Sequence, residues 1–226
     1  MQRFNCFTQI HKGLRALLFD TALCLQQADF TCEEEAEEAL NKVREAVLLF
    51  DEHAHKEDQF LLPMIADFEP SVLDCFEKEH ATDLALSNQL TASVETFFLL
   101  TNNEEKKATG QQLCTAFVEF TSFNLQHMAK EEDLINKILW RFFSDEALMN
   151  AQQQIIQSTP PWLMDFYAKW MLRGISTPEA IQWLQAVQKT APDVVFQTLY
   201  NKAEKELSAK QFQTVAAALT EGVLAA

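Results

Sequence analysis

Glycine and proline are scarce, with four and six copies in 226 residues. The hairpin dipeptides Asn-Gly and Asp-Gly are absent, and no segment shows the alternation typical of strands. These absences argue against a β-rich fold. The residues that dominate instead are Ala, Leu, Glu, Gln and Lys, which are good helix formers. We therefore predict an all-α protein.

Basic residues are also in deficit, because 33 Asp and Glu face 18 Lys and Arg, a net charge of −15. The first 150 residues hold 27 of the acids and 12 of the bases, and they contain all five histidines. Residues 151–226 hold six of each sign. So acidic a chain lacks the basic patches that nucleic-acid binding requires. Its charge pattern predicts two parts, 1–150 and 151–226.

The five cysteines are dispersed and form no Cys-x-x-Cys pair. An odd, scattered set of this kind is typical of reduced thiols, so we expect a cytoplasmic protein. The N-terminus has no long apolar run, and neither a signal peptide nor a membrane span is expected. No Cys-based or Ser-based nucleophile is visible, and we predict no catalytic or organic-cofactor residue.

A repeated motif carries the chemistry. His53 is followed four residues later by Glu57, and His127 is followed in the same way by Glu131. On a helix, positions i and i+4 lie about 5–6 Å apart on one face. An imidazole and a carboxylate at that spacing can bind one metal ion, or the carboxylate can bridge two.

Hydrophobic periodicity predicts four long helices: about residues 4–27, Thr31 to Pro63, 72–99 and 105–143. Short connections between them favour an up-down-up-down four-helix bundle. In that topology one histidine from each helix comes to a common level: His11, His53, His80 and His127. His55, two residues after His53, is expected to be exposed.

Local signals suggest where these helices begin and end. Thr31 and Glu34 have the spacing of a capping box, Pro63 is expected to kink or end its helix, and 101–107 reads as a loop. The remaining chain predicts three or four shorter helices, with a second capping box at Ser176 and Glu179. Because this part is rich in aromatic residues, we expect it to pack on the bundle or to form an interface.

A single histidine on an apolar face is more often a structural residue than a ligand. Two carboxylates on inward faces are different, because a buried, unpaired carboxylate costs several kcal/mol. A pair of metal ions would compensate both. Mixed imidazole and carboxylate ligands favour Fe, Mn or Zn over Ca and Mg.

These residues resemble the hemerythrin-like (HHE cation-binding) family across about residues 5–143. The matching segments are His11, HKEDQFLLP preceded by His53, Glu79-His80, and HMAKEEDL. The resemblance implies a non-haem di-iron centre of the Fe-O-Fe type, in which Zn or Mn could substitute. It implies that Glu57 and Glu131 bridge two irons, one bound by His11 and His53 and the other by His80 and His127.

One departure is informative. Oxygen-carrying members have a fifth histidine on the third helix, and the corresponding positions here are Phe76 and Leu84. The remaining set of four His and two Glu is closest to that of the di-iron proteins that repair iron–sulfur clusters, although we expect the Cys-containing N-terminal domain often found in those proteins to be absent. Residues 170–203 weakly resemble a segment of plant iron-regulating ubiquitin ligases, but no RING zinc pattern is present.

We therefore expect a hemerythrin-like protein that binds two irons and handles or senses iron, O2 or NO. One alternative is a di-iron enzyme that repairs iron–sulfur clusters or reduces peroxide or NO. Another is a metal-free helical interaction module. The residues do not decide whether the protein is an enzyme. The expected partners are a diatomic ligand or peroxide, and a second copy or another protein at the C-terminal part.

Overall fold

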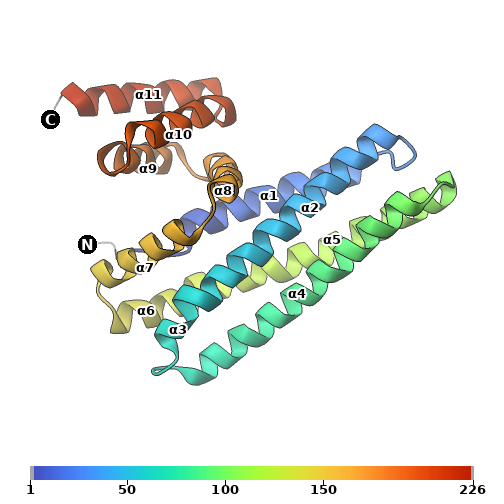
Figure 1. The fold of residues 1–226 in the computed structure, drawn as a ribbon, viewed down its shortest axis with the longest axis horizontal. Coiled ribbons are helices and arrows are strands. Elements are labelled where there is room, and N and C mark those ends of the chain that lie inside the picture. Colours follow the sequence, from blue (N-terminus) through green and yellow to red (C-terminus); the bar gives the residue numbers. More distant parts are fainter. Residues whose placement is uncertain (1–2, 225–226) are drawn as a thin grey trace. The chain divides into compact units, whose positions relative to one another are not determined.

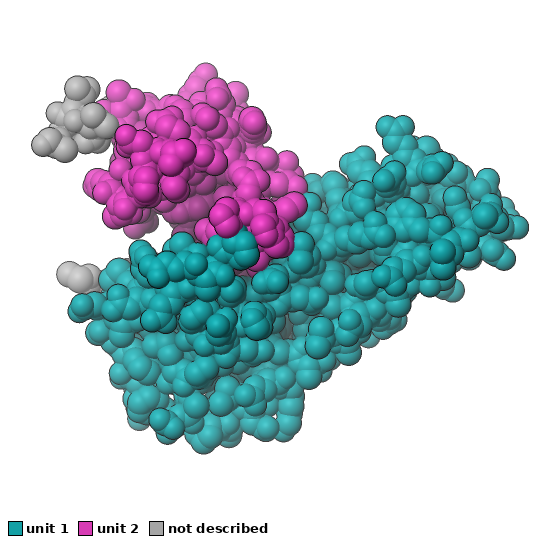
Figure 2. Space-filling model, in the orientation of Figure 1, with its two compact units in different colours: residues 1–8, 17–160 teal, residues 9–16, 161–226 magenta. Residues whose placement is uncertain are grey.

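The computed structural model describes residues 3–224, and within that range the secondary structure is entirely helical. The chain forms two compact units, which Figure 2 distinguishes by colour. Unit 1 comprises the N-terminal residues up to Thr8 together with Leu17–Pro160. Unit 2 comprises Gln9–Ala16 and Pro161–Ala226. The boundary predicted from charge, residue 150, lies inside helix α7 (Asp145–Ser158) of unit 1 and stays a prediction.

Unit 1 is built on a bundle of long helices (Figure 1). They are α1 (Thr8–Gln27, of which residues 17–27 belong to this unit), α2 (Glu33–Lys56), α4 (Pro70–Leu99) and α5 (Asn103–Lys130). Short turns join α1 to α2 and α4 to α5, so consecutive helices run in opposite directions (Figure 1). The predicted all-α, up-down-up-down architecture is confirmed.

Two of these helices are interrupted by π-helical segments. Segment η1 (Glu57–Leu61) follows α2 and leads into α3 (Leu62–Ile65), and η2 (Glu131–Ile135) follows α5 and leads into α6 (Asn136–Phe142). Pro63 contributes to the first interruption, because it cannot donate a hydrogen bond to the carbonyl of residue 59. No proline accompanies η2, so proline is not a general cause. Such single-turn π segments are often found at functional sites.

Two predicted helix starts were wrong. Cys32, not Thr31, is the residue before α2, and the Thr31 hydroxyl donates to Asp29 Oδ1 at 2.7 Å instead of capping the helix.

The predicted loop at 101–107 is mostly helix, since α5 begins at Asn103. Its N-terminus is capped by Asn102, whose side chain accepts from the backbone N–H of Glu104 at 2.8 Å. Acidic residues in the first turn further favour that end of the helix.

The core of unit 1 next to the π segments is apolar. It combines residues from η1, α3, α4, η2 and α6 with α7 (Asp145–Ser158), including Leu61, Ile65, Phe76, Ile135, Leu139 and Leu148. Each fully buried side chain of this size stabilises the fold by roughly 1.5–3 kcal/mol. Arg3 ties the N-terminal residues to this region, since it donates to Asp145 Oδ1 and to the carbonyls of Trp140 and Phe143.

Unit 2 consists of four helices of 14–16 residues packed with Gln9–Ala16 of α1. They are α8 (Pro161–Gly174), α9 (Thr177–Thr190), α10 (Asp193–Glu206) and α11 (Ala209–Leu224). The predicted capping box at Ser176 and Glu179 is confirmed, and Glu179 also binds Lys12 Nζ at 2.6 Å. Gly174 must be glycine, because an added Cβ would lie 2.2 Å from the Lys12 carbonyl oxygen.

No helix within residues 3–224 is long and apolar enough to cross a bilayer.

Candidate metal centre

The six predicted ligand residues come together in two overlapping groups. One group contains donor atoms of His11, His53, Glu57 and Glu131, and the other contains donor atoms of Glu57, His80, His127 and Glu131. Within each group the donor atoms all lie within 4.8 Å of one another. The two carboxylates belong to both groups. Each group could hold a metal ion.

The carboxylates are almost completely removed from solvent, with Glu57 2% and Glu131 1% exposed. In each His-x-x-x-Glu pair, the imidazole Nε2 lies 3.1 Å from the carboxylate Oε1. His80 Nε2 faces both acids, at 3.6 Å from Glu57 Oε2 and 3.8 Å from Glu131 Oε1. Two carboxylates buried this deeply require compensating positive charge, which bound cations or protonated histidines can supply.

The two π segments begin at these same acids. Segment η1 starts at Glu57 and η2 starts at Glu131, each immediately after the α-helix that carries the paired histidine. In each pair, therefore, the histidine lies in the α-helix and the acid four residues later is the first residue of the wider π-helical turn. The paired motif predicted that each histidine lies beside its acid, but it carried no signal for this change of helix type.

Two further carboxylates hold the outer nitrogens of the histidines. His80 Nδ1 lies 2.7 Å from Asp58 Oδ1, and His127 Nδ1 lies 2.8 Å from Glu79 Oε2. Because an ionised carboxylate only accepts hydrogen bonds, Nδ1 carries the proton in both rings. Each Nε2 is then buried, directed towards Glu57 or Glu131, and without a hydrogen bond of regular geometry. A carboxylate on the outer nitrogen is the usual support for a metal-binding histidine.

Sequence reasoning did not assign roles to Asp58 and Glu79. A signal was present, because Asp58 directly follows one core acid and Glu79 directly precedes His80. Glu79 is further anchored by Lys130, whose Nζ lies 2.6 Å from its Oε1.

The electrostatics of the site follow from these contacts. Burial lowers the pKa of His80, but the hydrogen bond to Asp58 and the carboxylates of Glu131 and Glu57 outweigh it and raise the pKa to about 12. Burial also lowers the pKa of His127, and here too the acids beside the ring raise it above its ordinary value. Without metal, the His80 ring is therefore protonated at neutral pH, and the acids beside His127 favour its protonated form. A metal ion would take the place of protons in the centre.

The donor chemistry fits a metal site. Four imidazoles and two carboxylates form a mixed nitrogen and oxygen set that suits Fe, Mn or Zn better than Ca or Mg. Cys6, which is buried nearby, does not add a thiolate. Its pKa is raised to about 12 by burial and by the charge of Glu57, so it remains a neutral thiol. All five cysteines are free.

The two positions considered for a fifth histidine supply no ligand. Phe76 is buried with its ring centroid 5.5 Å from that of His127, on which Phe123 stacks from 5.9 Å away. Leu84 is 52% exposed. His55 is exposed, as predicted, and belongs to neither donor group.

Comparisons with known proteins agree with this geometry. The family model of the hemerythrin HHE cation binding domain matches residues 5–139, which is more than half of the chain. Searches of curated proteins and of solved structures found no match.

Proposed function

The chain belongs to the hemerythrin HHE cation-binding domain family, and we propose that it binds two iron ions and uses them to handle or sense O2, NO or iron. The proposed ligands are His11, His53, Glu57, His80, His127 and Glu131. His11 and His53 would hold one iron and His80 and His127 the other, and Glu57 and Glu131 could contribute to both, since they belong to both donor groups. The observation that carries the proposal is that two buried carboxylates are shared by two groups of donor atoms.

The acidic residues at the proposed centre have two different roles. Glu57 and Glu131 neutralise the charge of the bound ions, and Asp58 and Glu79 orient two imidazoles so that each Nε2 faces the centre. When bound, an iron pair with only six protein ligands supplies open coordination positions for a diatomic ligand or peroxide. Because Asp58 and Glu79 hold a proton on Nδ1 of His80 and His127, Nε2 is the nitrogen that each ring can offer to a metal.

A second candidate is a di-iron enzyme that repairs iron–sulfur clusters or reduces peroxide or NO. It is favoured by Phe76, which places an apolar ring rather than a ligand beside His127. A centre that lacks this ligand has one protein donor fewer to compete with a reactant. Catalytic consumption of peroxide or NO would favour the enzyme, and stoichiometric binding without turnover would favour a carrier or sensor. We further propose a cytoplasmic location, consistent with the free cysteines.

The proposal is tested by loading the full chain anaerobically with Fe2+ and recording absorption spectra before and after addition of O2 or NO. The expected result is new near-ultraviolet and visible bands that saturate at a fixed ratio of gas to protein. His127→Ala should remove most of the response, whereas His55→Ala, which removes an exposed histidine outside the donor groups, should leave it unchanged. An identical response in both variants would contradict the assignment. A folded protein that binds no metal would instead support a helical interaction module.

A further inference from the structure

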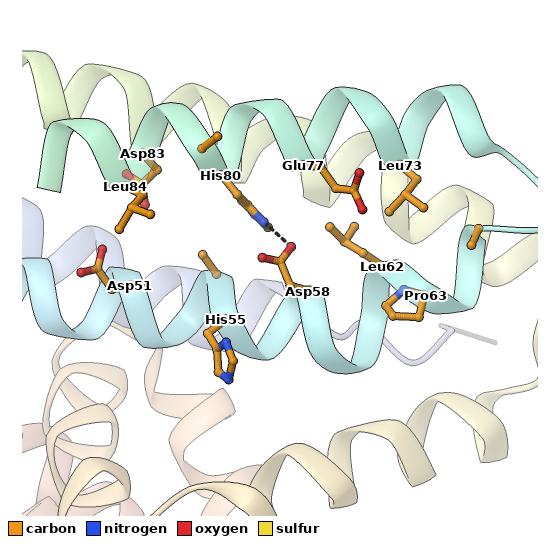
Figure 3. A pocket seen from close by; sticks show the side chains of 13 residues that line it. Asp51, His55, Asp58, Leu62, Pro63, Leu73, Glu77, His80, Asp83 and Leu84 are labelled. Atoms are coloured by element: carbon orange, nitrogen blue, oxygen red, sulfur yellow. Dashed lines mark hydrogen bonds and ion pairs between the residues drawn. The ribbon is translucent and has the colours of Figure 1, made fainter. Parts of the chain in front are cut away.

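A cavity of about 750 Å³ opens in unit 1 between α2 and α3 on one side and α4 on the other (Figure 3). Its walls include carboxylates from both sides: Asp51 and Asp58 from the α2 side, and Glu77 and Asp83 from α4. None of the described residues that line it is lysine or arginine. His55, although it borders the cavity, points away from α4 in Figure 3. The cavity therefore presents an excess of negative charge.

The cavity reaches the metal centre. His80 forms part of its lining and also belongs to one of the donor groups. In Figure 3 its ring points across the cavity to Asp58, with which it forms the 2.7 Å contact through Nδ1. The side chain of His80 is thus shared by the cavity wall and the candidate metal centre.

Asp51 and Asp83 lie on facing helices farther along the cavity, where Figure 3 places them opposite each other. Asp83 is only 3% exposed, and its Oδ1 accepts a 2.6 Å hydrogen bond from Asn124 Nδ2. Burial raises its pKa, and the charge of Asp51 raises it further, against the opposing effect of Asn124. These two carboxylates are close enough to interact, and the charges of His127 and His80 also oppose the rise in the pKa of Asp83.

The polar atoms around Asp51 are incompletely satisfied. Its Oδ1 is buried, and so is the hydroxyl of Ser87, a residue that is 1% exposed; neither makes a hydrogen bond of regular geometry. The hydroxyl is nevertheless near enough to lower the pKa of Asp51, which burial raises. Buried polar atoms without regular partners are uncommon, and a hydrated cation in the cavity beside Asp51 would give its Oδ1 a partner.

We propose that this cavity is the route by which divalent cations reach the metal centre, and that Asp51 and Asp83 bind them transiently on the way. This inference rests on the proposed function, because it requires a metal centre to fill. Two carboxylates with neutral oxygens nearby hold a hydrated divalent cation weakly, whereas the mixed imidazole and carboxylate set beyond His80 binds it more tightly. A cleft lined by one sign of charge raises the local concentration of the opposite ion and its rate of association. These acids would raise neither the local concentration nor the association rate of a neutral gas, because it carries no charge.

The test is the rate at which the metal-free full chain takes up Co2+, followed by its visible absorption in a stopped-flow instrument. The variant is Asp51→Asn with Asp83→Asn, which keeps side-chain size and removes two negative charges. We expect uptake to slow by about tenfold or more with an unchanged final stoichiometry. The matched control is Glu95→Gln with Glu119→Gln, which removes the same charge from exposed positions outside the cavity and should load at close to the wild-type rate.

A second variant protects the test against misfolding of the first. Leu84→Lys adds a positive charge to the cavity wall at a residue that is 52% exposed, so no buried group is disturbed. It should also slow uptake without lowering stoichiometry, and raised salt should reduce the difference from wild type. Wild-type rates in both variants would overturn the route while leaving the metal centre intact. Failure of the wild-type chain itself to bind Co2+ would overturn the proposed function instead.

Discussion

Replacing Glu79 by Gln should weaken metal binding without abolishing it. Glu79 touches the proposed centre only through His127, whose Nδ1 lies 2.8 Å from its Oε2. Glutamine retains the length of the side chain but removes the charge, so the strong bond to the imidazole becomes an ordinary one. Loss of such an outer partner typically lowers metal affinity 10–100-fold, equivalent to about 1.4–2.7 kcal/mol.

The assay is a competition titration in which Co2+ or Zn2+ is shared between the protein and a chelator of known affinity. Circular dichroism at the same time checks that the helices are intact. The matched control is Glu95→Gln, on the same helix α4 but exposed and away from the centre. The variant should keep the wild-type stoichiometry, lose affinity by the stated factor, and differ clearly from the control. Affinity equal to that of the control would refute the role of Glu79 in orienting His127.

Three further predictions follow from other contacts. Because the pKa of His80 is raised, metal binding at pH 7.5 should release at least one proton per chain, as measured by calorimetry in buffers of different ionisation enthalpy; no buffer dependence would contradict this. Gly110→Ala should lower the free energy of unfolding by about 1–3 kcal/mol in denaturant titrations, because an added Cβ would lie 2.2 Å from the buried Phe30 ring; an increase in stability would be the opposite result. Partial burial raises the pKa of Glu179, but hydrogen bonds from Lys12 and Ser176 outweigh it and lower the pKa to about 2, so this group stabilises the fold above its unfolded pKa and loses that contribution as pH falls from about 5 towards 2. In Glu179→Gln, that part of the acid destabilisation should be absent from melting curves taken across this range; a curve with the wild-type pH dependence would contradict it.

The fold could be predicted because its signals are local and repeated. Four long apolar stripes, few helix breakers and short turns leave a helical bundle as the simple packing solution. The proximity of the donor residues in the two His-x-x-x-Glu pairs was also predictable, since the i,i+4 spacing survives the change to a π segment. Their burial then follows from the apolar stripes on which they lie.

Features that depend on tertiary contacts were not predictable in the same way. The hydrogen bonds of Asp58 and Glu79 to histidines on other helices depend on the register between helices, which no local pattern reports. The prediction of a loop at 101–107 was wrong because polar composition was given more weight than the capping ability of Asn102. Likewise, no periodicity indicated that residues 9–16 of the first helix would pack with the C-terminal helices.

The central claim is tested most directly by the metal content of the full chain after anaerobic loading with Fe2+ and removal of unbound ions. The account predicts about two irons per chain in the wild type. It also predicts strong loss of iron in a Glu57→Gln, Glu131→Gln double variant that remains helical. Wild-type protein that is folded but binds no iron, or a double variant that retains both ions, would contradict it.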